Sequence, residues 1–357
     1  TTGQVRPQLW RTRARDLLGP VAYIDVDGTM APTHGEKKAG MDISHKGVWG
    51  YAPLIVSLAN TKEVLYLVNR PGNATSHQGA APWIDAAIDL VHPHAQRLCL
   101  RGDTDFSLTA HFDRWAEDAD FIFGMDCNSA LRTHAEVLEE SAWQRLQRRP
   151  QYEAQTDQTR QRFQDNEKQR IVRERGFVKL ELNFEDVAEF DYQPGKCHRP
   201  YRVVALRKNI SKRQGAQVLF DDIRYFFYIT TRTDLSAAEV VFCANERCDQ
   251  ENVIEQLKNG VNALRLPVYD LLSNWAYMVI AALAWNIKSW FAMMMHRHHD
   301  RRQYIRMEFR TFVNRIILIP AQVVRRARRT TLRIIGYQPA LDRLFSTWCA
   351  IEHTGFS

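Results

Sequence analysis

The segment Val21-Ala22-Tyr23-Ile24-Asp25-Val26-Asp27-Gly28-Thr29 joins an apolar run to two carboxylates. The apolar run predicts a buried β-strand over residues 21–27. Because side chains alternate along a strand, Asp25 and Asp27 project from the same face. Asp27 is nearer to the strand end, where the sites of α/β sheets usually open. The segment therefore predicts a polar site at the end of a central strand.

The residues that follow this segment predict the order of the neighbouring strands. Residues 53–58 and 63–68 are strand-like and are separated by an Asn60-Thr61-Lys62 turn, so three antiparallel strands are expected first. Helices and strands then alternate, with a helix at 83–91, a strand at 98–101, a helix at 106–116 and a strand at 120–125. These later strands would join in parallel through helical crossovers. The expected fold is a ribonuclease H-like mixed α/β sheet flanked by helices.

The second half of the chain predicts an insertion into this core. Residues 178–184 alternate between apolar and polar side chains, and 201–206 and 217–220 are candidate partner strands. Residues 224–231 would return the chain to the main sheet, and 249–264 would form a helix. The expected parts are an N-terminal remnant (1–17), the first part of the core (18–132), a helical and β insertion (133–222), the second part of the core (223–295) and a basic helical C-terminal region (296–357).

Charge is distributed unevenly along the chain. The net charge is +7, yet residues 288–343 alone hold 13 Lys/Arg against 3 Asp/Glu. Such a local excess favours a polyanionic partner, nucleic acid first and an acidic membrane second. A solvated helical face is the simpler interpretation of one charged run alone. Arg325, Arg326, Arg328 and Arg329 form its densest cluster and are candidate DNA contacts.

Two further features bear on the cellular compartment. The six cysteines include no CxxC pair, which is typical of reduced thiols and gives no zinc signal. Residues 271–287 carry no charge, but they are fewer than the ~20 apolar residues that a membrane span needs, so a buried core helix is expected. The N-terminus has no signal-peptide core. A cytoplasmic protein without a membrane partner is predicted.

A second carboxylate and a polar helix face complete the candidate site. Asp103 follows the predicted strand 98–101, next to the strand of Asp27, and two carboxylates at adjacent strand ends can share a hard cation such as Mg²⁺. On a helical wheel, Arg247, Glu251 and Lys258 fall on one stripe. A solvated ion-pair face is the simpler interpretation of that stripe taken alone.

These residues resemble a known signature. Arg247, Glu251 and Lys258 are spaced like the R-E-K part of the YREK signature in DDE transposases of bacterial insertion sequences. Asp27-Gly28-Thr29 resembles the first D-x-T of that family, and the segment around Asp103 resembles its second acidic segment. The similarity extends from about residue 17 to residue 337. Ala244 stands where the signature has Tyr, which puts a DNA contact made by that Tyr in question.

The resemblance implies a metal-dependent nuclease and strand-transfer enzyme of the bacterial cytoplasm, associated with the nucleoid. Asp27, Asp103 and Glu251 would be the catalytic triad and would bind two Mg²⁺ or Mn²⁺ ions. Arg247 and Lys258 would contact DNA phosphate, with Lys46, Trp49 and Arg70 as further candidates for contacts with strand ends. The expected substrate is double-stranded DNA, both terminal inverted repeats and target, bound by a homodimer.

Two alternatives stay open at the level of sequence. Asp25-Val26-Asp27-Gly28-Thr29 also matches the nucleophile loop of haloacid dehalogenase-like phosphatases, in which Asp25 would be phosphorylated. That class does not account for Glu251 or for the two strands that come next. The third interpretation is a non-enzymatic DNA-binding remnant, because only 26 residues precede Asp27, where the resembling family usually carries a helical DNA-binding region.

Overall fold

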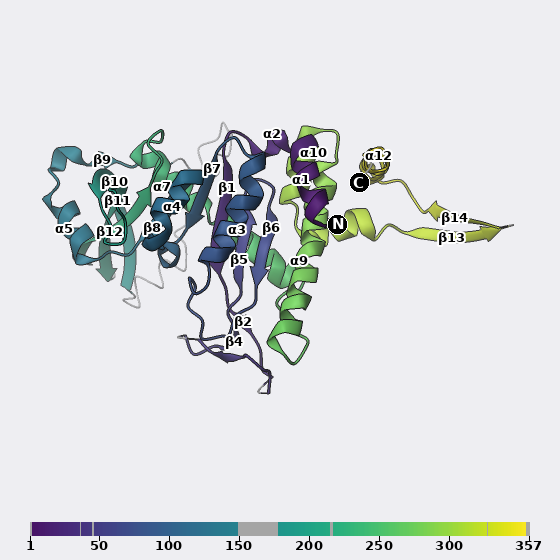
Figure 1. Cartoon of the computed structure of the whole chain (residues 1–357), viewed down its shortest axis with the longest axis horizontal. Helices are drawn as coiled ribbons and strands as arrows, with labels where there is room; N and C mark the ends of the chain where they lie inside the picture. The colour runs from purple at the N-terminus through teal and green to yellow at the C-terminus, as the bar shows by residue number, and fades with distance from the viewer. Residues whose placement is uncertain are drawn as a thin grey trace. The chain divides into compact units, whose positions relative to one another are not determined.

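The computed structural model describes residues 2–35, 37–44, 46–148, 178–214, 217–326 and 328–354. The chain divides into two compact units, one formed by residues 1–121 and 246–357 and the other by residues 122–245. The five-part division expected from the sequence stays a prediction. The mixed α/β architecture is confirmed, with parallel and antiparallel strands and helices packed against them (Figure 1).

The sheet of the first unit is built around β1 (Ala22–Gly28). Strand β1 pairs antiparallel with β5 (Leu54–Leu58), β5 pairs antiparallel with β6 (Glu63–Val68), and β1 pairs in parallel with β7 (Leu98–Gly102). This gives the strand order β6-β5-β1-β7, as the sequence predicts for the start of a ribonuclease H-like core. All five residues of β5 are buried, so both faces of the sheet are covered.

Helices cover this sheet on both sides. Helix α3 (Ala81–Val91) packs on β1, β5 and β6 through the apolar stripe expected from its sequence spacing (Figure 1). Helices α8 (Asp249–Glu255) and α9 (Leu271–Met293) supply a second set of apolar side chains, which form one core with the strands. That core includes Ile55, Leu67, Leu257, Met278 and Trp285.

Helix α9 also closes the edge of the sheet at β6. Asn286 accepts from the backbone N–H of Val64 and donates to its carbonyl, both at 2.8 Å. The indole N–H groups of Trp275 and Trp285 donate to the carbonyls of Leu67 and Lys62. These bonds satisfy backbone groups that an open edge strand would expose. They account for Asn286 in the uncharged run. Among the described residues, no helix has the length and apolar character that a membrane span requires.

Several segments depart from the secondary structure expected from the sequence. Instead of one helix over 106–116, the chain forms two short 3-10 turns, η2 (Thr104–Phe106) and η3 (Thr109–His111), before α4 (Phe112–Asp118). The Asp103 side chain caps the first of these turns. The helix expected over 249–264 ends early, since α8 widens into the π-helical turn η5 (Gln256–Gly260), in which the Val261 N–H donates to the Gln256 carbonyl.

The remaining elements of the first unit are short or peripheral. They are α1 (Thr2–Thr12), α2 (Arg15–Leu18), η1 (His92–His94), α10 (His298–Arg306), α11 (Phe309–Phe312), η6 (Val313–Ile317), α12 (Pro339–Glu352) and a small sheet of β2 (Ala31–Pro32), β4 (Trp49–Tyr51) and β3 (Asp42–Ile43). The basic C-terminal region was expected to be helical. Its arginine cluster instead lies on a hairpin of β13 (Ala321–Arg326) and β14 (Arg329–Ile334), where β-branched residues favour strands.

The second unit holds a set of antiparallel strands in the order β8-β12-β11-β10-β9. The long strands are β10 (Val178–Tyr192), β11 (Tyr201–Gln214) and β12 (Gln217–Thr230). Strands form in this region as expected, but their register differs from the prediction. Residues 201–206 pair with 187–192 of β10, and 217–220 pair with β11 rather than with 178–184. Residues 217–220 and 224–230 belong to one strand, β12. The other elements are β8 (Asp120–Met125), α5 (Ser129–Val137), η4 (Glu140–Ala142), β9 (Gln144–Arg145) and α7 (Ala237–Glu246).

Candidate active site

Asp27 and Asp103 lie at the carboxyl ends of adjacent parallel strands. In the register of β1 and β7, Asp25 is opposite Arg101. Asp27 and Asp103 each follow by two residues, so they occupy corresponding positions where the two strands end. Both side chains are only partly buried. The sequence predicts that these two acids lie at adjacent strand ends, and in the structure the parallel pairing of their strands brings them there.

Burial and neighbouring charges raise the pKa of both carboxyls. Burial raises the pKa of Asp27 to about 6, with Arg247 acting against that shift and the negative charge of Asp103 adding to it. Burial likewise raises the pKa of Asp103, and Arg247 again acts in the opposite direction. Two carboxylates that repel each other in a desolvated place favour either a proton or a cation. This donor set is the kind that a hard divalent cation binds.

Arg247 is the cation that the chain itself brings to this pair. Its guanidinium Nη1 lies 3.2 Å from Asp27 Oδ2, and both side chains are about one-sixth exposed. The backbone N–H of Gly28 donates to the other oxygen of Asp27 at 2.8 Å. Arg247 precedes α8, so the helix predicted to carry the third acid is attached next to this ion pair.

Asp25 has a different environment from Asp27. Its two carboxylate oxygens accept from Arg101 Nε at 2.7 Å and from Arg101 Nη2 at 2.9 Å, and both residues are almost fully buried. Burial raises the pKa of Asp25, whereas Arg101 lowers it. A carboxylate held at both oxygens and 1% exposed is not accessible for attack on a phosphoryl group. This disfavours the phosphatase alternative, which needs Asp25 as the nucleophile.

Helix α8 is anchored to the sheet by a residue that sequence patterns missed. Gln250 is buried, and its side-chain amide donates to the carbonyls of Asp25 and Ile55 at 3.1 Å each. Its neighbour Glu251 is exposed. Among the described residues, no group of three acidic, His or Cys side chains is close enough to hold a metal ion, so Glu251 does not join Asp27 and Asp103 here. A buried Gln in a polar helix gives no signal in a single sequence.

The other predicted DNA contacts lie at several places in the first unit. Lys258 is half-buried in η5. Lys46 and Trp49 are exposed on the small sheet, in the turn before β4 and on β4 itself. Arg70 is only 8% exposed, and its guanidinium donates to the carbonyls of Ala52, Ser76 and Gln78. Its burial lowers its pKa to about 10. Arg70 therefore holds the loop after β6, whereas Lys46 and Trp49 are open to a ligand.

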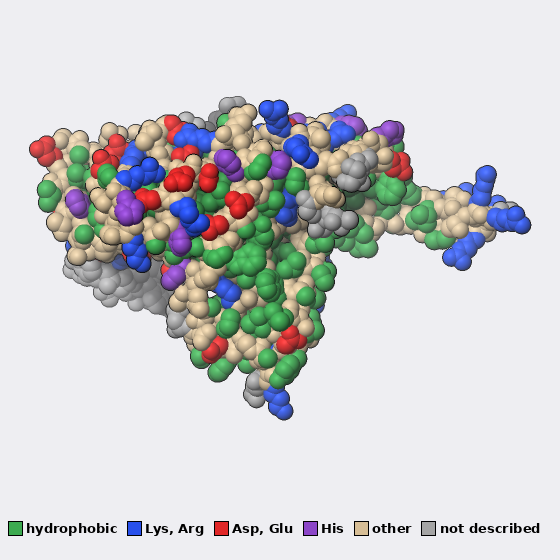
Figure 2. All heavy atoms as spheres, in the orientation of Figure 1, with side chains coloured by type: hydrophobic (Ala, Val, Ile, Leu, Met, Phe, Trp, Pro, Cys, Tyr) green, Lys and Arg blue, Asp and Glu red, His purple; other side chains and the backbone are tan. Residues whose placement is uncertain are grey.

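The arginine cluster is exposed on the β13–β14 hairpin. Arg325, Arg326, Arg328 and Arg329 are all exposed, and Lys and Arg side chains gather at the end of the hairpin in Figure 2. The structure does not bring this cluster to the acidic pair through any described hydrogen bond or ion pair. It is a separate basic surface of the first unit.

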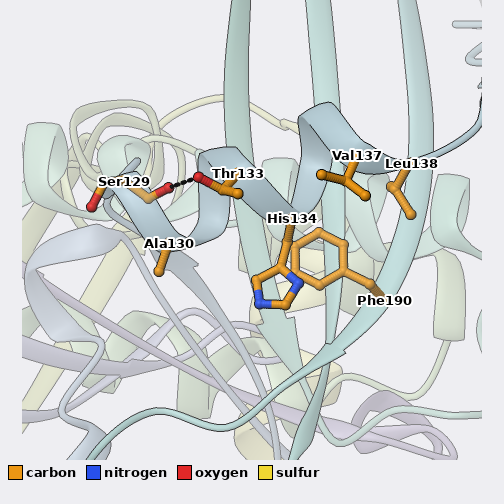
Figure 3. A pocket seen from close by; sticks show the side chains of 7 residues that line it. All are labelled: Ser129, Ala130, Thr133, His134, Val137, Leu138 and Phe190. Carbon is orange, nitrogen blue, oxygen red and sulfur yellow. Dashed lines mark hydrogen bonds between the residues drawn. The ribbon is translucent and has the colours of Figure 1, made fainter.

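A hollow of about 600 Å³ in the second unit contains no such acids. It lies between α5 and Phe190 of β10. The rings of His134 and Phe190 are stacked with 5.2 Å between their centres, and Figure 3 shows the two side chains side by side. Thr133 donates to the carbonyl of Ser129 within the helix. The other residues that line the hollow are small or apolar. Nothing in this hollow offers the chemistry found at the end of β1.

Sequence comparison gives the family. Residues 20–355 match the family described as transposase DDE domain group 1. The chain belongs to the DDE transposase family. Members of this family generally use divalent metal ions, in agreement with the paired acids of this DDE domain. No curated protein matches the chain in sequence.

One solved structure shows a more distant likeness to this DDE domain. It is the cryo-EM structure of the piggyBac transposase synaptic complex with hairpin DNA. The TM-score is 0.42 at 10% sequence identity, over 86% of this chain and 57% of that one. This DDE domain thus spans little more than half the length of that transposase. The assignment of Asp27, Asp103 and Glu251 as its catalytic triad stays a prediction.

Proposed function

We propose that the chain is a DNA transposase of the YREK type found in bacterial insertion sequences. It would nick DNA at the terminal inverted repeats of its element and join the freed strand to target DNA. Membership of the DDE family supports the class of reaction. The observation that carries the proposal is the pairing of Asp27 and Asp103 at the ends of β1 and β7.

The chain's own groups suit the binding of divalent ions. Asp27 and Asp103 are proposed to bind two Mg²⁺ or Mn²⁺ ions, and Glu251 of α8, which is not gathered with them in this structure, is proposed to join them when the ions bind. Such ions, when bound, activate a water or a 3′-hydroxyl and stabilise the leaving oxygen of an in-line displacement. Asp27 has to lose its proton first, which its pKa of about 6 permits at neutral pH. Asp25 and Gln250 act as positioning residues, because they fix Arg101 and α8 against β1.

Arg247 is proposed to have two partners. Without a bound cation it balances the charge of Asp27 across 3.2 Å. A metal ion would take over that role, and the guanidinium would then be available for a DNA phosphate near the cut. Lys258, Lys46, Trp49 and the four hairpin arginines are proposed as further DNA contacts, with Trp49 suited to stack on an unpaired base.

Assembly and location follow from the proposed substrate. Two element ends have to be held together for the strand transfer, so we propose a homodimer that bridges two DNA ends. An enzyme with a chromosomal DNA substrate would work at the nucleoid of a bacterial cytoplasm.

The test is Mg²⁺-dependent nicking of a duplex that carries the element's terminal repeat. Asp27→Ala, Asp103→Ala and Glu251→Ala are each expected to abolish nicking while leaving DNA binding in EDTA. Matched controls are Asp105→Ala, two residues beyond Asp103, and Glu255→Ala, one helical turn beyond Glu251; both are exposed and should nick like the parent. If any of these three variants nicks DNA as well as the parent, the residue that it replaces is not part of the catalytic triad. Binding without nicking in the parent would identify an inactive remnant.

A further inference from the structure

We propose that the β13–β14 hairpin is a two-stranded ribbon that enters the major groove of duplex DNA through one defined face. This inference deepens the proposed function, because it assigns the DNA-binding mode of one surface. The hairpin is suited to the task in its dimensions. The major groove, which is ~12 Å wide, admits a two-stranded β-ribbon, and its base edges carry the fuller donor and acceptor pattern.

The pairing register separates the side chains of the hairpin into two faces. Opposite residues in an antiparallel pair share a face, and the next pair along points to the other. The basic face consists of Gln322, Val324, Arg326, Arg329, Thr331 and Arg333. The apolar face consists of Ala321, Val323, Arg325, Thr330, Leu332 and Ile334. The basic face thus offers guanidinium, amide and hydroxyl donors, which are the groups that contact phosphates and base edges.

The tip of the hairpin is locally unfavourable as a free structure. Arg326 and Arg329 are directly opposite each other, and like charges in that position destabilise a strand pair. Arg328, in the turn between them, has φ of 68°, a left-handed conformation that glycine or asparagine adopts far more easily. No acidic residue occurs between Glu308 and Asp342 to offset these charges. Local conflicts of this kind point to a functional constraint, and a polyanion would relieve the repulsion.

The exposure of the hairpin supports the same conclusion. Val324 and Ile334 are its only half-buried residues in the described part, and all others are exposed. Within that part no arginine of the hairpin forms an ion pair with an acidic side chain. The cations are therefore available to phosphate groups, and six-residue strands give a ribbon of about 20 Å, long enough to follow a groove across several base pairs.

The experiment measures binding of a fluorescein-labelled duplex of mixed sequence in EDTA, so that it does not depend on cleavage. The affinity is measured at several salt concentrations, and log K is plotted against the logarithm of the salt concentration. Each phosphate contact contributes about 0.9 to the magnitude of the slope of this plot. The double variant R326T/R329T is expected to lower the slope by about 1.8 and the affinity at every salt concentration. R325T removes a single charge from the opposite face of the same strand and should lower the slope by clearly less than 0.9.

Three further variants separate charge from folding. R328G removes a cation while giving the turn the residue that its φ prefers, so it should weaken DNA binding without loss of thermal stability. R333T lies at the far end of the basic face and should lower the slope by about 0.9. R132A removes an exposed arginine from α5, where it pairs with Glu136, and should bind as the parent does.

Competition identifies the groove. Methyl green, which occupies the major groove, is expected to displace the parent, and distamycin, which occupies the minor groove, is not. The inference is overturned if R326T/R329T binds like the parent, if only distamycin competes, or if the hairpin arginines affect capture by acidic lipid vesicles and not by DNA. Because binding is measured without metal, absence of nicking would count against the proposed function alone.

Discussion

Asp25 and Arg101 are opposite each other in the parallel pair β1–β7 and form an ion pair joined at two points, with Nε–Oδ1 at 2.7 Å and Nη2–Oδ2 at 2.9 Å. Both side chains are at most 3% exposed. The Arg101 guanidinium also lies 4.5 Å from the ring centre of Tyr23. The pair thus ties together the two strands whose ends carry Asp27 and Asp103.

Arg101→Ala is expected to destabilise the protein strongly, because it leaves the Asp25 carboxyl buried without its partner. Loss of one member of a buried ion pair costs about 3–5 kcal/mol in the free energy of unfolding. Arg101→Lys keeps the charge but loses the two-point contact, so it should not restore stability fully. Chemical denaturation measures both effects.

A double variant separates the charge from the packing. D25L/R101M removes both charges and should be more stable than Arg101→Ala alone, since no buried charge is left unpaired. Arg114→Ala is the matched control, because Arg114 pairs with Asp85 at the surface and should change stability by about 1 kcal/mol or less. If Arg101→Ala and Arg114→Ala lower the free energy of unfolding equally, the buried ion pair contributes no more to stability than the surface pair.

The raised pKa of Asp27 makes the stability of the protein depend on pH. Its folded value of about 6 is above the ordinary 3.8, so the folded chain binds more protons between these values. The free energy of unfolding should therefore fall as the pH rises from about 4 to 6, by up to about 3 kcal/mol from this group. Asp27→Asn should lack that component and be more stable than the parent at pH 8.

Urea denaturation across this pH range, with and without Mg²⁺, provides the measurement. Mg²⁺ should stabilise the parent at pH 8 and lose its effect near pH 5, where a proton occupies the Asp27 carboxyl. Asp89→Asn, at an exposed position of α3, should retain the pH dependence of the parent. If Asp27→Asn shows the same dependence of stability on pH as the parent, protonation of Asp27 is not the cause of that dependence.

The amino-acid sequence predicts the features of this fold that depend on neighbouring residues, and it does not reveal those that depend on tertiary contacts. Asp27 and Asp103 were predictable, because each follows an apolar strand and the strand order brings the strand ends together. Gln250 and Arg101 were not singled out, since their partners on β1 are set by tertiary packing and strand register. The arginine cluster is expected on an amphipathic helix, because apolar patches lie between arginines along residues 301–333, yet the β-branched residues beside it favour a hairpin.

Glu63 is another residue whose role depends on tertiary contacts that the sequence does not reveal, and its contacts lead to a further prediction. It is fully buried, and its carboxylate accepts from Arg6, from Thr61 and from the indole N–H groups of Trp10 and Trp290. It therefore ties α1 and α9 to the start of β6. In the sequence it is an ordinary polar residue at the start of a strand, 53 and 227 positions away from its tryptophan partners.

Trp290→Phe removes one hydrogen bond to the Glu63 carboxylate and keeps most of the ring. A hydrogen bond to a charged group contributes about 1.5–3 kcal/mol, and a loss of that size in the free energy of unfolding is expected. Trp348→Phe is the control, because its indole bonds Glu352 on the exposed surface of α12. Denaturation curves that coincide for the two variants would show that the buried carboxylate does not depend on Trp290.

Lys288 predicts a second pH dependence, opposite in sign to that of Asp27. Its ammonium is buried in α9, donates to the carbonyls of Ile305 and Met307, and lies 3.7 Å from the ring centre of Trp285. Burial lowers its pKa from 10.5 to about 7, with a smaller contribution from Lys62. Between these values the unfolded chain binds more protons, so this group's contribution to stability rises with pH and is lost as the pH falls through 7.

Lys288→Met fills the same space without a titrating group, so its stability should lack this component. From pH 7 to 10 the unfolding free energy of the parent is expected to rise relative to that of the variant by about 3–4 kcal/mol. Lys196→Met removes an exposed lysine and should follow the parent at every pH. Parallel pH profiles for the parent and Lys288→Met would mean that the buried amine keeps its proton throughout this range, held by the two carbonyls and the Trp285 ring.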